Sequence, residues 1–122
     1  MTSPENIARF ISASFRSVWS LELLLLLKRQ PGFHSRDELI GYLRGSELVV
    51  AQALDSLVAC GLAVIDEAGQ ASYLPASADL ALLVDGTEDL YARKPDFVRR
   101  LIVAGSAPGL NAFAEAFRLR KD

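Results

Sequence analysis

The sequence predicts a mainly α-helical protein with a small β-hairpin. Apolar residues recur at helical spacing over most of the chain, and several of these stretches follow a serine that can cap a helix. Two short β-prone runs, residues 62–65 and 71–74, are separated by the turn-forming segment Glu67–Gln70. Residues 35–74 therefore read as helix, tight turn, helix, strand, turn and strand, and the remaining helices are expected on either side of this unit.

Length and composition predict one globular domain. The chain has 122 residues, of which 51% are hydrophobic and 23% are charged, which is enough for a real core. We expect residues 1–19 to form an N-terminal flanking helix, residues 20–75 the central unit and residues 76–122 further helices. The longest apolar run, Leu21–Leu27, is interrupted by Glu22 and is much shorter than the roughly 20 residues of a membrane span. We therefore expect a cytoplasmic protein with no membrane contact.

The N-terminal stretch predicts a helix that begins at the capping-box pair Thr2 and Glu5. Its apolar positions form one stripe that ends near Trp19, and Ser20 is placed to cap the next helix, Leu21–Arg29. Two interpretations of the stripe have equal weight: packing on its own chain, or a surface for a second subunit. The stripe consists of Ile7, Phe10, Ile11, Phe15 and Val18.

The central stretch predicts two helices joined by a tight turn. Ser35 and Glu38 have the spacing of a reciprocal capping box at the start of the helix Arg36–Arg44. Gly45-Ser46 then interrupts the pattern, and Ser46 can cap the helix Glu47–Cys60. Apolar residues cover much of the girth of this second helix: Leu48, Val49, Ala51, Ala53, Leu54, Leu57 and Val58.

The segments LELLLLLKRQPG and DELIGYLRGSELVVAQALDSLVACGLAVID, with the strand that follows, resemble the winged-helix family of small bacterial regulators. The resemblance spans Leu21–Leu74, under half of the chain. It implies a winged helix-turn-helix core with flanking N- and C-terminal helices that form a two-fold homodimer. The sequence itself shows only amphipathic helices that fit such a dimer. The candidate interface residues are Ile7, Phe10, Ile11, Phe15, Phe97, Leu101, Phe113 and Phe117.

The charge pattern of the central unit opposes DNA binding. In DNA-binding relatives the third core helix lies in the major groove. Here this helix has no lysine or arginine, and residues 35–74 carry a charge of −4, from two basic and six acidic residues, against −2 for the whole chain. Affinity for DNA rests largely on neutralised phosphates. The candidate contacts, whether to a protein or to DNA, are Arg36, Arg44, Ser46, Glu47, Gln52, Asp55, Ser56 and Glu67.

The C-terminal part predicts more helices. Ser77 can cap a helix over residues 78–93, which either continues through Gly86 or breaks there, and the unbroken phase of its apolar stripe favours one helix. Pro95 can begin the next helix. A loop is expected over residues 105–109, followed by a final amphipathic helix from Leu110.

Catalytic and metal-binding patterns are not found. His34 and Cys60 are the single histidine and cysteine, and neither has ligand-type neighbours in sequence, so we predict no enzyme activity, metal or cofactor. Three hypotheses follow: a non-catalytic winged-helix regulator that contacts an unknown protein partner, placed first; a dimeric DNA-binding transcription regulator; and a ligand-sensing regulator, which is compatible with either. Residues that could line a ligand pocket are Phe15, Trp19, Tyr42 and Tyr91.

Overall fold

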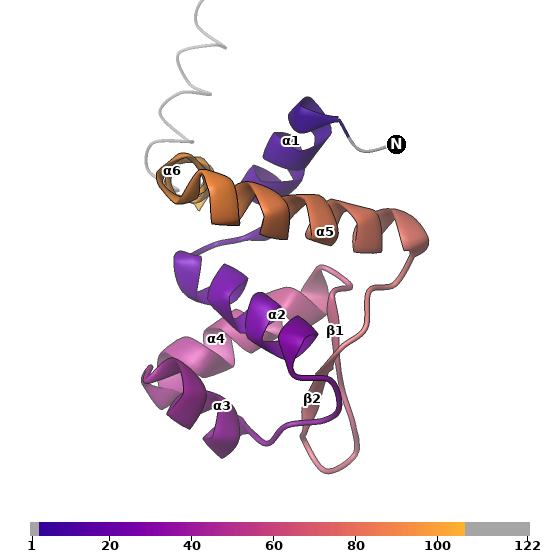
Figure 1. Cartoon of the computed structure of the whole chain (residues 1–122). Helices are drawn as coiled ribbons and strands as arrows, with labels where there is room; N and C mark the ends of the chain where they lie inside the picture. Colours follow the sequence, from indigo (N-terminus) through magenta and orange to yellow (C-terminus); the bar gives the residue numbers. More distant parts are fainter. Residues whose placement is uncertain (1–2, 107–122) are drawn as a thin grey trace, which may run out of the picture.

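The computed structural model describes residues 3–106, which fold into helices and one two-stranded antiparallel sheet. Figure 1 shows two layers: a lower layer made of α2, α3, α4 and the hairpin, and an upper layer in which α5 lies across α2 beside α1 and α6. The fold is thus mainly α with a small β-hairpin, as the sequence predicted. The elements are α1 (Pro4–Ser14), α2 (Val18–Arg29), α3 (Arg36–Leu43), α4 (Glu47–Ala59), β1 (Ala63–Ile65), β2 (Ala71–Tyr73), α5 (Ala78–Arg93) and α6 (Pro95–Ser106).

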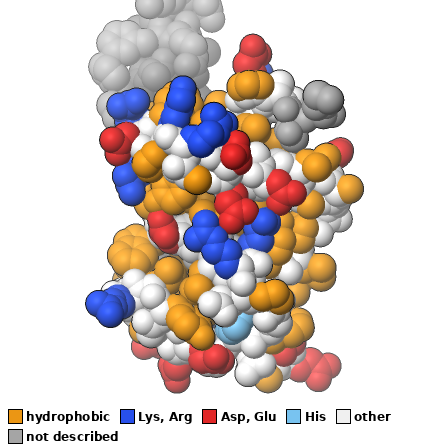
Figure 2. Space-filling view, viewed as in Figure 1, with side chains coloured by type: hydrophobic (Ala, Val, Ile, Leu, Met, Phe, Trp, Pro, Cys, Tyr) orange, Lys and Arg blue, Asp and Glu red, His pale blue; other side chains and the backbone are white. Residues whose placement is uncertain are grey.

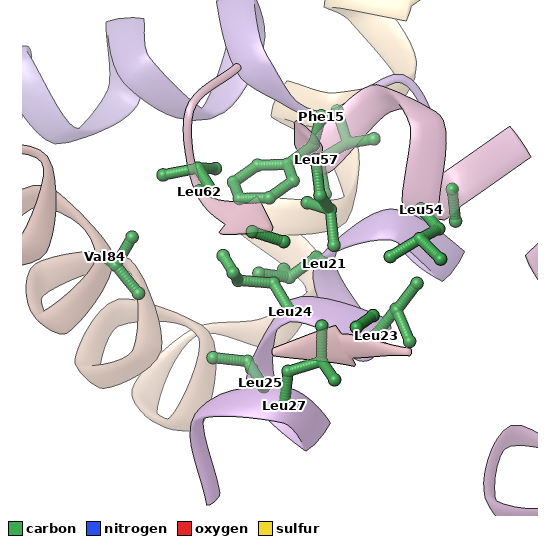
Figure 3. Close-up of a cluster of buried hydrophobic side chains, with 14 of the residues drawn as sticks. Phe15, Leu21, Leu23, Leu24, Leu25, Leu27, Leu54, Leu57, Leu62 and Val84 are labelled. Carbon is green, nitrogen blue, oxygen red and sulfur yellow. The ribbon is translucent and has the colours of Figure 1, made fainter. Parts of the chain in front are cut away.

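Helix α2 lies at the centre of the core because its leucines are buried on several sides. It contacts α4 and β2 in the lower layer and α6 in the upper layer. Figure 3 shows its leucines surrounded by Phe15, Leu54, Leu57 and Leu62, with Val84 of α5 near the same cluster. Five leucines of α2 are at most 2% exposed: Leu21, Leu23, Leu24, Leu25 and Leu27.

Serine caps fix where the helices begin. Ser35, Ser46 and Ser77 cap α3, α4 and α5 as predicted, and Ser35 and Glu38 form the full capping box, with hydrogen bonds of 3.2 and 2.9 Å. The cap of α1 is Ser3, whose side chain accepts from the amide of Asn6 at 3.1 Å. Thr2, which the sequence suggested for this role, lies outside the described residues.

The prediction of one stripe from Ile7 to near Trp19 was wrong, because the chain turns after Ser14. Phe15 has extended backbone angles, and α1 and α2 are bent by 110° at their junction. Ser17, and not Ser20, caps α2: Ser17 accepts from the amide of Ser20, and Ser20 accepts from the amide of Ser17. This reciprocal pair satisfies the free amides locally and so favours a new helix over continuation of α1.

Two glycines allow the helices of the upper layer to approach closely. Helix α5 is continuous through Gly86, where a Cβ would lie 2.6 Å from Cδ1 of Ile7 in α1. At Gly105 a Cβ would lie 2.5 Å from the backbone oxygen of Ser12. Gly105 lies within α6 and not in the predicted loop, because a glycine can keep helical geometry where another backbone comes this near.

Charged side chains join the two layers. Lys28 of α2 contacts Glu88 of α5 at 2.7 Å and Asp85 at 3.4 Å, and Arg29 contacts Glu88 at 3.1 Å. The hydrogen bond between Lys28 and Glu88 is the main reason that the pKa of Glu88 lies below its usual value and that of Lys28 above it. These contacts join segments about 60 residues apart in the sequence, so they depend on α5 lying across α2.

No single helix within residues 3–106 is long and apolar enough to cross a membrane, although the bent pair of α1 and α2 would pass such a test together on length and composition.

Candidate interaction surface of α4 and the hairpin

The orientation of α4 follows from its cap and its buried face. The hydroxyl of Ser46 accepts a hydrogen bond from the amide of Val49 at 3.1 Å, which starts the helix directly after the turn from α3. Four residues then face the leucines of α2: Val50, Ala53, Leu54 and Leu57, each at most 4% exposed. The rest of the helix surface is turned away from the core.

The outward side of α4 combines acidic, amide and apolar side chains. Glu47, Gln52 and Asp55 are exposed, as is Leu48, whose side chain is 65% exposed. Leu48 and Val58 belong to the apolar girth that the sequence shows for this helix, and the structure leaves both exposed. A single packed layer covers only one side of a helix, so a helix that is apolar over most of its girth must leave some apolar residues in contact with water.

The hairpin places its turn at the lower end of the molecule. Its register pairs Ala63 with Tyr73 and Ile65 with Ala71. Asp66 accepts hydrogen bonds from the amides of Ala68 and Gln70 at 3.0 and 2.8 Å, and Gly69 adopts a φ of +81°, which a glycine tolerates without strain. The carboxylate of Asp66 therefore serves the turn, whereas Glu67 is exposed at its tip.

An apolar cleft of about 580 Å³ lies between the end of α4 and the hairpin. Three large apolar side chains around it are open to water: Val58 is 38% exposed, Ile65 is 40% exposed and Leu74 is 58% exposed. Asp55 stands on the same helix as Val58, and Asp66 follows Ile65. The remaining lining residues are Gly61, Ala63, Val64, Pro75 and Ala76.

Neither α4 nor the hairpin contains a lysine or an arginine. The sequence has no lysine or arginine from residue 45 to residue 92, a stretch that contains α4, the hairpin and nearly all of α5. Figure 2 shows acidic side chains gathered at the lower end, where α3 and the hairpin turn lie, and most basic side chains in the upper half. A negative potential over this end repels phosphate and favours a basic partner.

The predicted contact residues do not form one basic site. Arg36 and Arg44 are exposed at opposite ends of α3, and Arg44 adopts a left-handed φ of 56° at the helix end. The hydroxyl of Ser46 is engaged in capping α4. Gln52 and the half-buried Ser56 line a separate hollow of about 390 Å³, together with Arg16, Ser17, Trp19, Ser20, Val49 and Ala53.

The predicted dimer residues differ widely in exposure. Phe10, Ile11 and Phe15 are at most 8% exposed in the core of the single chain, so this part of the stripe packs on its own chain. Ile7 and Leu101 are partly buried, and Phe97 is 39% exposed on α6. Phe113 and Phe117 lie outside the described residues. The homodimer itself stays a prediction.

The single histidine and cysteine have structural contacts. Nε2 of His34 donates to the carbonyl of Gln30 at 2.7 Å, and the backbone of His34 forms a β-bridge with Ala71. The Sγ of Cys60 lies 3.5 Å from the carbonyl oxygen of Ser14. Between residues 3 and 106, no three or more histidine, cysteine, aspartate or glutamate side chains gather in a way that could hold a metal ion.

Comparisons of this chain with protein-family models, with curated proteins and with solved structures found no match.

Proposed function

We propose that this chain is a non-catalytic winged-helix regulatory module that acts by binding another protein through α4 and the hairpin. The arrangement of α2, α3 and α4 followed by a two-stranded hairpin is compatible with a winged helix. The observation that carries the proposal is the cleft between α4 and the hairpin, an apolar surface flanked by acidic residues and without any basic one. Exposed apolar patches of this kind are typical of protein contacts.

The chemistry of this face defines the partner. Apolar side chains of the partner would fill the cleft beside Val58 and Leu74, and lysine or arginine residues would face Asp55, Glu47 and Glu67. Charge complementarity speeds association and selects partners, while the apolar centre supplies most of the affinity. A segment with apolar anchors and basic flanks is the expected ligand.

DNA binding is the competing function, and salt dependence separates the two. We would mix the protein with genomic DNA fragments at about 20 and about 200 mM salt, a range over which phosphate contacts weaken strongly. We expect no binding at either concentration. Binding that falls steeply with salt would contradict the proposal and support a DNA-binding regulator, in which case substitutions of Arg36, Arg44 and Gln52 should weaken it.

A gain-of-charge variant is the positive control for this experiment. Replacing Glu47, Gln52 and Asp55 with lysine places three positive charges on the exposed side of α4. If α4 occupies the position of a recognition helix, this triple variant should acquire salt-dependent DNA binding while the native chain stays inert. A triple variant that folds and still does not bind would contradict the winged-helix interpretation of this face.

Site-specific cross-linking tests the protein contact directly. A photoreactive residue in place of Leu74 should give a discrete adduct with another protein in the producing cell. The additional substitution Val58→Glu, in the same cleft, should abolish the adduct, whereas Leu82→Glu, at an exposed apolar residue of α5, should not. Equal adduct formation from a photoreactive residue at the exposed Ala92 of α5 would contradict the proposed surface.

A further inference from the structure

A second cleft, away from the hairpin, combines aromatic rings with a carboxylate. It has a volume of about 380 Å³ and lies between the first turns of α2 and the end of α3, lined by Val18, Trp19, Glu22, Tyr42 and Leu43. Trp19 is 39% exposed and Tyr42 is 53% exposed. Two large aromatic side chains are therefore open to water at one small cleft, beside a glutamate.

The carboxylate of Glu22 forms no ion pair within the part of the chain that the structure describes. Among residues 3–106, no lysine, arginine or histidine nitrogen lies within 4 Å of it. One of its oxygens, Oε2, accepts a hydrogen bond from the hydroxyl of Tyr91 on α5. Burial and this hydrogen bond raise the pKa of Tyr91, so the phenol keeps its proton at neutral pH and remains a donor. Glu22 is thus held in place, and its carboxylate forms no ion pair with any basic residue between positions 3 and 106.

The Trp19 side chain packs against a neighbouring turn. A Cβ at Gly45 would lie 3.4 Å from Cζ3 of Trp19, so the ring rests close to the backbone of the turn between α3 and α4. The guanidinium of Arg99 lies 5.6 Å from the centroid of the Tyr91 ring and is paired with Asp96 at 3.0 Å. Arg99 therefore has its own counter-charge.

We infer that the cleft formed by Trp19, Tyr42 and Glu22 is a binding site for a small organic cation with an alkylated ammonium group. Aromatic rings attract a cation through their quadrupole, and tryptophan does so most strongly. A fixed carboxylate adds a Coulomb attraction that a neutral molecule of the same shape does not experience. An alkylated ammonium is weakly hydrated compared with a metal ion and offers methyl groups to Val18 and Leu43, so it matches both the rings and the apolar part of the lining. This inference is independent of the function proposed for the α4 surface.

The single tryptophan makes the site directly observable. Trp19 is the only tryptophan of the chain, so a change in its fluorescence reports on this cleft or on the adjoining hollow beside Gln52, which Trp19 also lines, and the variants below separate the two. We would titrate the full-length protein with choline and, in parallel, with 3,3-dimethylbutan-1-ol, which has the same shape and no charge. Sodium chloride would keep the ionic strength constant. Choline should change the emission in a saturable way and bind at least tenfold more tightly than the alcohol.

Two variants with a matched control identify the residues. Glu22→Gln keeps a hydrogen-bond acceptor for Tyr91 and removes the charge, so it should weaken choline binding at least tenfold. Tyr42→Leu removes one ring at an exposed position and should also weaken it. Glu47→Gln removes one negative charge from α4, outside the cleft, and should leave binding unchanged.

Three results would overturn the inference: no saturable response to choline, equal binding of choline and the neutral alcohol, or equal effects of Glu22→Gln and Glu47→Gln. Circular dichroism of each variant, with the native spectrum as the reference, separates loss of the site from loss of the fold.

Discussion

The two layers differ in how much of the apolar surface of each helix is covered by neighbouring elements. In the upper layer, α1 and α6 each have one apolar stripe, and the buried residues of each face neighbouring helices. In the lower layer, α2 is apolar on nearly all sides because both layers pack on it. Helix α4 is at least as apolar, yet its buried residues lie on one side, and Leu48 and Val58 remain exposed. Where a helix has apolar surface that the rest of its own chain does not cover, we expect a partner protein to bind.

The largest expected effect tests whether the lower layer holds the fold together. Leu54 is fully buried against α2, so Leu54→Asp places a charge in the core and should lower the free energy of unfolding by more than about 4 kcal/mol. We expect loss of cooperative thermal unfolding by circular dichroism. Leu74→Asp, at a residue 58% exposed in the same layer, should stay folded. An unchanged melting temperature for Leu54→Asp would show that α4 is misplaced.

The next effect concerns the close helix approach in the upper layer. Gly105→Ala would bring a methyl group to 2.5 Å from the backbone oxygen of Ser12, which cannot move aside as a side chain can. We expect a loss of about 1–3 kcal/mol in urea denaturation. Gly41→Ala in α3 is the control, because nothing lies within 4 Å of its Cβ. It should stabilise the protein by about 0.5–1 kcal/mol through helix propensity alone.

The ion pairs between the layers should give a smaller, pH-dependent effect. Because the folded state holds the pKa of Glu88 below its unfolded value, the group stabilises the protein above about pH 4.3, and this contribution disappears as the pH falls through the folded pKa. Glu88→Gln should cost about 1 kcal/mol at pH 7 and nothing near pH 2. Denaturation across this pH range measures the difference. A cost that is equal at both pH values would show that packing, and not charge, joins the layers at this point.

The smallest effect is expected at the turn between α3 and α4. Arg44 has a φ of 56°, a conformation that costs most residues free energy but is open to glycine. Arg44→Gly should therefore stabilise the protein by up to about 1 kcal/mol, less the entropy that glycine adds to the unfolded chain. The melting temperature should rise by a few degrees. A lower melting temperature would mean that the Arg44 side chain makes a contact that offsets the backbone strain.

The sequence predicted local features well because they depend on neighbouring residues. Ser35, Ser46 and Ser77 cap their helices through hydrogen bonds that span three residues, and the continuity of α5 through Gly86 followed from the phase of its own stripe. The break after Ser14 was missed because the apolar spacing happens to continue in phase from Phe15 to Val18 across a non-helical turn.

The candidate sites depended on contacts between distant segments, which spacing does not reveal. Glu22 and Tyr91 are 69 residues apart, and nothing in either local pattern indicates that they meet. Phe15 was grouped with Trp19 and Tyr42 as a possible pocket residue, yet it is 1% exposed in the core. The absence of basic residues within α4 and the hairpin was visible from the sequence, whereas the exposure of Leu48 and Leu74 depends on how the layers pack.

The long interval without lysine or arginine also determines which proteolytic and chemical-labelling methods can be applied to α4 and the hairpin. Trypsin cleaves after these two residues, so α4, the hairpin and all of α5 remain in one large peptide, from Gly45 to Arg93, even when the chain is fully unfolded. Tryptic mapping and amine-reactive cross-linkers, which need lysine, therefore give almost no information on α4 and the hairpin. Enzymes that acetylate or ubiquitinate lysine have no target there either. Glu-specific proteolysis and carboxylate-directed reagents are the methods that can reach this surface.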